Sequence, residues 1–290
     1  MERITMASIV LRTFLISVLF TSFGFVENNP LPEDTKEQNY KTTIDHWHAQ
    51  RVNNLKKEHG WLSLIDLVWL KEGKNSIPLI GDITLENGKL FVTLKKNIRA
   101  TSAGKVFTSG VVQSEKDKIV FGSKAFVVIE RDGKYAVRIW DSEHSARKKF
   151  TAIERYPVSE AWRIEARWEP YPKPKKVEIV TVIPGIIEEG IASGVAIFTV
   201  AGKEYRLEPT VDSAQTEYFF VFGDKTNGRE TYSAGRFLDA DPPVNGTIIL
   251  DFNKSTNPPC AFTNYATCPV PLKENRLSLK IEAGEKKYHQ

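Results

Sequence analysis

Apolar and polar residues alternate in short runs along most of this chain, and Gly, Asn and Pro separate the runs. Two of the separators are tight-turn signals. Asn87-Gly88 lies between the β-rich residues 83–85 and 89–94, and Asp132-Gly133 lies between residues 125–130 and 134–140. Asn-Gly and Asp-Gly tolerate the positive φ angles of two-residue hairpin turns. The pattern therefore predicts two β-hairpins.

Further β-rich runs follow at short intervals, at residues 118–121, 163–168, 176–183, 194–200, 204–207, 217–222 and 247–252. Many short strands with turn residues between them are typical of antiparallel sheets, whereas a parallel sheet needs long helical crossovers. We predict a mainly β fold, an antiparallel β-sandwich or barrel. Residues 143–150 predict one short helix.

One amphipathic helix is expected before the strands, at residues 36–58. Asp34 or Thr35 is a candidate N-cap, and Gly60 would end the helix. Apolar residues recur near helical spacing on one face, which we expect to pack on the sheets: Tyr40, Ile44, Trp47, Val52 and Leu55. The apolar residues 61–70 after it predict a buried strand and turn.

The N-terminus has the features of a secretory signal peptide. Arg3 and Arg12 precede and flank the apolar residues 14–25, and Ser22 and Gly24 suit a cleavage site after residue 24. An uncleaved anchor that starts near Ile9 remains an alternative. We therefore expect an exported protein, periplasmic or secreted, with residues 1–24 removed and no membrane span afterwards.

We expect residues 25–35 to be a flexible leader and residues 36–290 to form one β-rich domain. Residues 170–176 carry clustered prolines, which cannot donate hydrogen bonds to a sheet, and this segment is a possible sub-domain boundary. The composition is that of a globular chain, with 41% hydrophobic and 26% charged residues. The net charge of +4 is spread along the chain, which argues against a nucleic-acid partner.

Residues 251–268 contain both cysteines of the chain, Cys260 and Cys268, behind two prolines and among Asp and Asn side chains. Two cysteines at short spacing in an exported protein favour a structural disulfide. A pair of free thiols, or metal or redox chemistry, remains open. A zinc site would need further ligands, and we predict no metal and no cofactor.

Three stretches make the chain similar to a known family: Trp47-x3-Arg51-x3-Leu55 with GWLSL after it, residues 138–150, and above all the C-terminal third. They resemble the bacterial and archaeal family of domain of unknown function 1684, over roughly residues 47–286. The resemblance implies one folding unit with signature positions at Gly235-Arg236, residues 251–253, residues 257–260 and Cys268. It implies no activity, because none is established for the family.

The densest group of polar residues in the sequence lies in this C-terminal third. Arg236 either holds an anionic ligand or pairs with Glu230 or Asp251 and ties two strands together. Our hypothesis is that the residues beside the cysteines fold back to meet Gly235-Arg236 and wall a shared cavity. The candidate ligand-binding residues are Glu230, Tyr232, Arg236, Asp251, Asn253, Asn257 and Cys260.

Two functions agree with these residues. The first is an exported protein that binds an unknown small molecule beside the C-terminal loop. The second is a hydrolase-like enzyme that uses Arg236 with Asp251 or Cys260. The chain has no Gly-x-Ser-x-Gly, no phosphate-binding Gly-x4-Gly-Lys and no His-Glu-x2-His motif. The sequence therefore identifies no catalytic residue, and the binding function is favoured.

Overall fold

The computed structural model describes residues 33–211 and 218–288. The predicted signal peptide and the leader up to residue 32 lie outside the described residues. The chain then enters helix α1 (Glu33–Leu55), which is confirmed as a helix with one buried face; Ile44 and Leu55 are its most buried side chains. The helix begins earlier than predicted, so Asp34 and Thr35 are inside it and the N-cap prediction is wrong.

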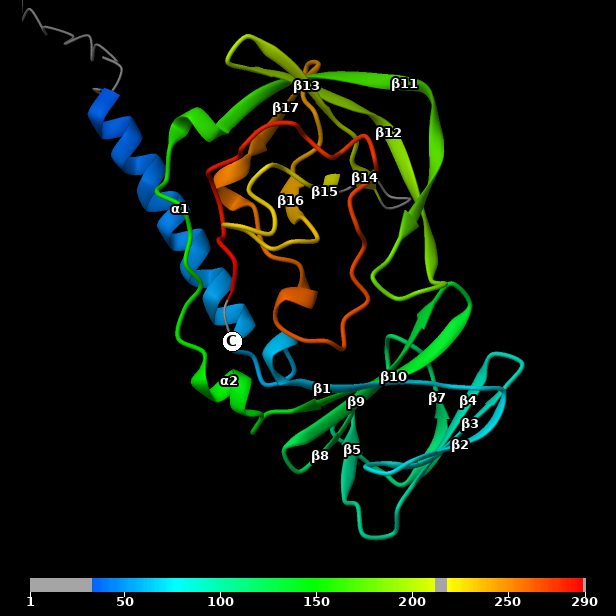
Figure 1. Cartoon of the computed structure of the whole chain (residues 1–290). Helices are drawn as coiled ribbons and strands as arrows, with labels where there is room; N and C mark the ends of the chain where they lie inside the picture. The colour runs from blue at the N-terminus through cyan, green and yellow to red at the C-terminus, as the bar shows by residue number, and fades with distance from the viewer. Residues whose placement is uncertain (1–32, 212–217, 289–290) are drawn as a thin grey trace, which may run out of the picture.

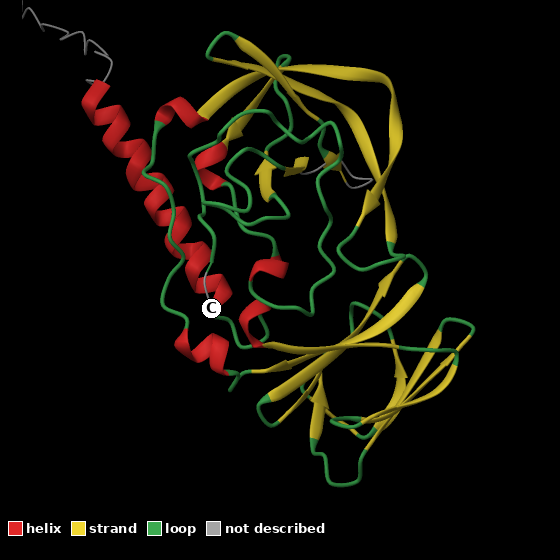
Figure 2. Cartoon of the chain, in the orientation of Figure 1, coloured by secondary structure: helices red, strands yellow, loops and turns green. Residues whose placement is uncertain are grey.

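An N-terminal β unit of two antiparallel sheets follows (Figures 1 and 2). Its first sheet has the order β1 (Leu64–Trp69), β10 (Lys134–Asp141), β9 (Lys124–Arg131), β8 (Ile119–Phe121), β5 (Ala100–Ser102) and β6 (Lys105–Phe107). The second sheet has the order β2 (Gly73–Ile77), β3 (Gly81–Glu86), β4 (Lys89–Leu94) and β7 (Ser109–Val112). One apolar core includes side chains of both sheets, such as Ile83, Val92, Phe126, Val137 and Ile139.

Both predicted hairpins are confirmed. β3 pairs with β4 around Asn87-Gly88, and β9 pairs with β10 around Asp132-Gly133. All four turn residues have positive φ, which only Gly, Asn and Asp adopt readily, and this is why these dipeptides mark the turns. A short helix α2 (Ser145–Lys149) then leads out of the unit, within the predicted residues 143–150.

The C-terminal β unit is built on one antiparallel sheet with the order β16 (Arg236–Ala240), β15 (Tyr218–Phe222), β14 (Thr210–Val211), β12 (Ile187–Val200), β11 (Arg163–Val180) and β17 (Thr247–Asp251). β13 (Lys203–Leu207) also pairs with β12. Residues 170–176 lie inside β11, and the register with β12 shifts between Pro170 and Lys175. The prolines thus interrupt the ladder locally, as their missing N–H requires.

Residues 252–288 cover this sheet without forming a strand of their own; they contain only short 3₁₀ turns and isolated bridges. In Figure 1 this orange and red segment runs between α1 and the sheet. Leu277, Ile281 and Ala283 from the segment share a core with Phe220 and Phe222 of β15. A segment of this kind must satisfy its backbone polar groups by means other than a β-ladder.

The two β units meet at the tip of the β11–β12 hairpin. Lys134 Nζ donates to Gly185 O at 2.7 Å, and Arg131 Nε lies 3.1 Å from Glu188 Oε1. On its other side the tip pairs with the segment that carries the cysteines, because Val182 N donates to Cys268 O at 2.9 Å. The fold is mainly β with antiparallel sheets and one N-terminal helix, as predicted. Within the described ranges, no helix has the length and apolar character to span a bilayer.

Candidate functional site

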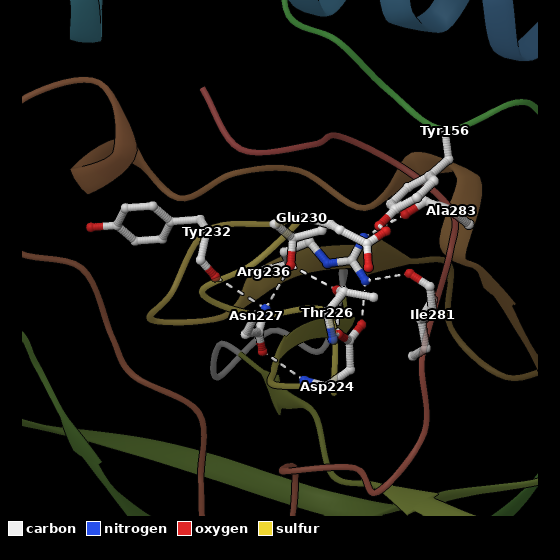
Figure 3. Close-up of polar contacts among 10 residues, drawn as sticks. Tyr156, Asp224, Thr226, Asn227, Glu230, Tyr232, Arg236, Ile281 and Ala283 are labelled. Carbon is white, nitrogen blue, oxygen red and sulfur yellow. Dashed lines mark hydrogen bonds and ion pairs between the residues drawn. The ribbon is translucent and has the colours of Figure 1, made fainter. Parts of the chain in front are cut away.

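Arg236, the cation of the predicted site, lies fully inside the C-terminal β unit (Figure 3). It begins β16, and its guanidinium forms an ion pair with the buried carboxylate of Asp224. Its Nη atoms also donate to the backbone oxygens of Ala283 and Ile281, the latter at 2.8 Å. The pairing alternative is thus favoured, but the predicted partners are wrong: Arg236 pairs with Asp224, not with Glu230 or Asp251.

The residues that follow β15 hold Asp224 in place (Figure 3). Its carboxylate accepts hydrogen bonds from the backbone N–H and the hydroxyl of Thr226, and the Thr226 hydroxyl contacts that of Thr231 at 2.8 Å. Both oxygens of the Asp224 carboxylate are therefore engaged. Burial lowers the pKa of Arg236, while the Asp224 carboxylate acts in the opposite direction and stabilises the cation. The pair joins β16 to residues 281–283 and leaves no free charge for a ligand.

Glu230 and Tyr232 lie near this network and make other contacts. Glu230 Oε2 accepts a hydrogen bond from Tyr156 Oη at 2.8 Å, which lowers the pKa of the Glu230 carboxyl. Tyr232 Oη donates to the backbone oxygen of Cys260 at 3.2 Å. Glu230 therefore attaches the segment before β11, and Tyr232 attaches the segment with the cysteines.

Asp251 and Asn253 fasten α1 to the C-terminal β unit. Asp251 Oδ1 accepts from Tyr40 Oη at 2.7 Å, and Asn253 Nδ2 donates to the same Tyr40 oxygen at 2.9 Å. Asn253 also bonds both the N–H and the C=O of Ser159, at 3.0 and 2.8 Å. Burial raises the pKa of Tyr40, and the hydrogen bond to Asp251 adds to this effect. Tyr40 thus stays protonated and acts as the donor that Asp251 needs.

Asn257 takes part in a third set of contacts, with the end of the chain. Its backbone N–H donates to Glu285 Oε2 at 2.6 Å, and its Nδ2 donates to Lys286 O at 2.7 Å. Glu285 is buried, and its other oxygen accepts from Arg51 Nε of α1 at 3.0 Å. The predicted site residues therefore fall into separate structural networks, and their roles as ligand-binding residues stay predictions.

The two cysteines lie next to each other as free thiols, so the predicted disulfide is not formed in this structure. The backbone N–H of Cys260 donates to Cys268 Sγ at 3.1 Å, and Cys260 Sγ lies 3.6 Å from Ala266 O. Cys268 is buried, and Cys260 is half-buried. A hydrogen bond from Cys268 lowers the pKa of the Cys260 thiol, and the charge of Arg138 adds to this effect. The pKa of Cys268 is raised by the same hydrogen bond and by burial.

A cavity of about 270 Å³ lies beside these thiols, where the two β units meet. We define the cysteine loop as residues 257–270; Pro259 and Cys268 of this loop form one wall. Phe219 and Phe237 form an apolar wall, with their rings 4.8 Å apart in an edge-to-face arrangement. The full lining is Trp61, Arg131, Arg138, Glu188, Phe219, Phe237, Pro259, Ala266, Thr267, Cys268 and Pro269.

Arg138 of β10 is the exceptional member of the lining. It is 8% exposed, and its Nε has no hydrogen-bond partner among the described residues. Its guanidinium lies 5.0 Å from the centre of the Trp61 ring. The other cation, Arg131, is already paired with Glu188 and Glu115. Arg138 therefore brings an unpaired positive charge to a buried position in the cavity wall.

The state of this charge follows from its surroundings. Burial is the main effect that lowers the pKa of Arg138, and the nearby charge of Arg131 lowers it further. A guanidinium nevertheless remains protonated at neutral pH. Because an unpaired buried cation is unfavourable, an anion that enters the cavity would gain a charge-assisted interaction and relieve this penalty. The electrostatics of the cavity thus favour an anionic ligand.

A second, larger hollow of about 540 Å³ lies between α1 and the β16–β17 edge, where Trp47, Arg163 and Asp251 line it. It is less suited to bind a ligand, despite its size. Arg163, Asp239 and Asp241 in its wall are exposed, and Asp251 is engaged by Tyr40. Exposed charges of both signs have a small electrostatic effect in water. We therefore regard the smaller cavity as the candidate site.

The hypothesis that Gly235-Arg236 and the cysteine loop wall a shared cavity is not supported as stated. The cysteine loop does meet the strand that begins at Arg236, but the next residue, Phe237, lines the cavity and Arg236 lies in the core. Successive side chains of a strand point to opposite faces, so Phe237 faces the cavity when Arg236 faces the core. Sequence analysis missed Arg138, although an arginine inside the apolar run AVRIW was a visible signal. In the described parts of the chain, no three His, Cys, Asp or Glu side chains are grouped to hold a metal.

Comparisons with known proteins support the predicted resemblance for the C-terminal half. Residues 148–286 match the family model described as "Protein of unknown function (DUF1684)". The matched segment starts after the N-terminal β unit, so the resemblance of residues 47–147 stays a prediction. No curated protein matches the chain.

One solved structure with a match is the solution NMR structure of the uncharacterized protein from gene locus rrnAC0354 of Haloarcula marismortui. It is 26% identical, and the match covers 49% of this chain and 79% of that chain, with a TM-score of 0.41. By the family model, the segment of residues 148–286 is thus similar to the family of proteins of unknown function designated DUF1684.

Proposed function

We propose that this protein binds a small molecule with an anionic group in the cavity between the two β units, against the cysteine loop. The observation that carries the proposal is the buried guanidinium of Arg138 in the cavity wall, whose Nε has no hydrogen-bond partner and which forms no ion pair among the described residues. Most buried charges in proteins are paired, because desolvation of an isolated ion is costly. A ligand that supplies an anion would offset the desolvation cost of this buried arginine.

The remaining walls indicate the shape of the ligand. Phe219, Phe237 and Trp61 offer apolar and aromatic surface, and the volume of about 270 Å³ is slightly below the range of drug-sized sites. A ligand with one carboxylate or phosphate and a small apolar or aromatic part fits these walls. The polar group would contact Arg138, and the apolar part would pack between the Phe rings and the cysteine loop.

The hydrolase-like alternative has weaker support from the contacts. Arg236 is occupied by Asp224, and Asp251 is occupied by Tyr40. A nucleophilic cysteine needs a neighbouring base. In the described part of the chain, His144 is hydrogen-bonded with Leu62 O at 3.0 Å and His59 packs beside Trp140, so each of these central histidines has contacts away from Cys260. Binding is therefore the function that we propose.

The test is a thermal-shift titration of the purified protein with matched probes. Benzoate and phenyl phosphate carry the proposed charge, and benzamide and benzyl alcohol have similar shape without it. We expect the anionic probes to raise the melting temperature of the wild type and the neutral probes to raise it less. Arg138→Gln should weaken anion binding by roughly tenfold or more, because a hydrogen bond to a charged group contributes about 1.5–3 kcal/mol.

The matched control is Arg167→Gln, which removes an exposed arginine of β11 that pairs with Glu169 on the surface. This variant should bind the anionic probes as the wild type does. If the anionic probes stabilise the wild type and Arg138→Gln equally, or if no anionic probe stabilises the wild type, the proposed site is wrong.

Export is a separate part of the proposal. It rests on the apolar residues 14–25 and their arginine flank. The mature protein recovered from an expressing cell should begin at residue 25, as its intact mass would show. Recovery of the full chain from the cytoplasm would contradict this part and leave the binding proposal unaffected.

A further inference from the structure

We propose that Cys260 and Cys268 exchange thiols with a small disulfide that carries a carboxylate, and that such disulfides are the ligand class of the cavity. This inference rests on the proposed function, because it uses the same cavity and the same Arg138. It adds an activity, the reversible reduction of a low-molecular-weight disulfide by the cysteine pair.

The arrangement of the two sulfurs supports this activity. The Cys260 N–H donates to Cys268 Sγ at 3.1 Å, so the Cys268 sulfur lies directly beside residue 260. The sulfurs are thus adjacent, as two cysteines must be if they are to form a disulfide without a large movement of the backbone. Cys268 lines the cavity, whereas Cys260 lies next to Cys268 behind the lining residue Pro259 and is the more exposed of the two cysteines. A disulfide in the cavity would therefore lie within reach of the pair.

The charges around the pair assign a role to each sulfur. Cys260 is the more exposed of the two thiols, and the positive charge of Arg138 favours its thiolate form by lowering its pKa. The thiolate is the form that attacks a disulfide, so Cys260 is the attacking cysteine. Cys268, whose ionisation is disfavoured until Cys260 has reacted, is the resolving cysteine. The backbone N–H of Cys260 stabilises the Cys268 thiolate in the second step.

The reaction has two balanced exchange steps. The Cys260 thiolate attacks one sulfur of RS–SR; the Cys260–SR bond forms, the RS–SR bond breaks, and the leaving RS⁻ takes up the proton that Cys260 released. Cys268 then loses its proton and attacks Cys260 Sγ; the Cys260–Cys268 bond forms, and the second RS⁻ leaves and is protonated. One small disulfide is reduced to two RSH, and two cysteines are oxidised to one disulfide.

Arg138 makes this exchange selective for the anionic substrate. Its guanidinium can hold the carboxylate of RS–SR while Phe219 and Phe237 contact the apolar part beside the reacting sulfurs. An uncharged disulfide gains no binding contact from the charge of Arg138. The structure therefore predicts a preference for anionic disulfides that disappears when the charge of Arg138 is removed and the thiols are kept.

The experiment uses two disulfides of opposite character with the reduced full-length mature protein. 5,5′-Dithiobis(2-nitrobenzoate) is an aromatic disulfide with carboxylates, and its released thiolate is followed by absorbance. Bis(2-hydroxyethyl) disulfide is uncharged, and its products are followed by mass. We expect the wild type to release two thiols from each disulfide and to form a Cys260–Cys268 bond, which peptide mapping identifies. Cys268→Ser should stop at the mixed disulfide on Cys260, and Cys260→Ser should react slowly.

The charge test compares Arg138→Gln with the surface control Arg167→Gln. Arg138→Gln should slow the reaction with the anionic disulfide by roughly tenfold or more beyond its effect on the reaction with the uncharged disulfide. Arg167→Gln should change neither rate. Circular dichroism and the melting temperature of each variant show whether it is folded.

The outcomes separate this inference from the proposed function. If no Cys260–Cys268 bond forms, or if the pair is a permanent disulfide that dithiothreitol does not reduce in the folded protein, the exchange activity is wrong, and Arg138-dependent binding of benzoate can still stand. If exchange occurs at the same rate with both disulfides and is insensitive to Arg138→Gln, the anion site is wrong, and with it the substrate class.

Discussion

The same substitution at two buried arginines of this protein should have different effects on the stability of the fold. Arg236 is fully buried and bonded to a carboxylate and two backbone oxygens. Arg138 is 8% exposed, its guanidinium lies 5.0 Å from the centre of the Trp61 ring, and among the described residues it forms no ion pair. Methionine has a similar length and no charge, so Arg236→Met and Arg138→Met remove charge with a small change in volume. We predict that the first destabilises the fold strongly and that the second does not.

The magnitudes follow from the partners that each variant leaves behind. Arg236→Met leaves the Asp224 carboxylate without its cation inside the protein, and removal of one partner of a buried pair costs about 3–5 kcal/mol. Because 1 kcal/mol shifts the melting temperature of a domain of this size by about 2–4 °C, the expected drop is roughly 6–20 °C. Arg138→Met loses a cation–π contact of about 0.5–2 kcal/mol but removes an unpaired buried charge of at least equal penalty.

The assay is urea unfolding of the ligand-free proteins by fluorescence, with the melting temperature as a second measure. The midpoint should fall for Arg236→Met and stay constant or rise for Arg138→Met. The exposed Arg167→Met should lie within about 0.5 kcal/mol of the wild type. Equal destabilisation by Arg138→Met and Arg236→Met would refute the reasoning, because Arg138 would then be a structural residue and the electrostatic basis of the proposed site would be lost.

Three further predictions concern the contacts that hold the fold. Tyr40→Phe removes the hydroxyl shared by Asp251 and Asn253, so it should cost about 1–3 kcal/mol and speed hydrogen exchange in α1. Burial lowers the pKa of His48, so on acidification the unfolded chain binds a proton before the folded protein does. The contribution of His48 to the free energy of unfolding should be complete above about pH 6.5 and fall at lower pH. Urea titrations at several pH values should show a smaller dependence of this free energy on pH for His48→Gln. Gly235→Ala would place a Cβ 2.6 Å from Pro271 Cγ at a φ of +109°, and its melting temperature should therefore drop.

The parts of the fold that local patterns determine could be predicted from the sequence. Asn87-Gly88 and Asp132-Gly133 set their hairpins because the turn needs residues that accept positive φ, and this requirement involves no distant contact. Strands such as β2 (Gly73–Ile77) and β6 (Lys105–Phe107) were missed, since their residues are mostly polar or exposed. These strands form through pairing with a neighbour, which the local sequence does not display.

The site was predicted less well, for a related reason. The sequence offered the C-terminal polar residues as a ligand site, which stays a prediction, and offered pairing as an alternative for Arg236 without its partner Asp224. Asp224 lies only 12 positions from Arg236 (236 minus 224) and was overlooked, and Arg51 and Tyr40 reach their partners across more than 200 positions. These distant contacts determine that Arg236 is paired and that Arg138 is not paired among the described residues. A charged residue inside an apolar strand, as at Arg138, is the one local signal that pointed to the cavity.

Three buried polar side chains of the C-terminal third have a common structural task. Residues 252–288 have no strand, so side chains replace the missing ladder: Arg236 bonds the backbone of residues 281 and 283, Asn257 bonds that of residue 286, and Asn275 Nδ2 bonds that of Glu208 and Val221 at 2.8 and 3.0 Å. These contacts hold the irregular segment on the sheet and need no ligand.

The arginine that would bind the charge of the ligand lies outside the segment that matches the family model. Arg138, Arg131 and Trp61 precede the segment that matches the family, whereas Phe219, Phe237 and Cys268 lie within it. The family segment thus supplies the apolar wall and the thiols, and the N-terminal β unit supplies the cation. Relatives that have the apolar wall and the thiols but no arginine facing the cavity should bind neutral ligands or neutral disulfides at the same place. Anion selectivity should therefore follow the residue that corresponds to Arg138, and not membership of the family.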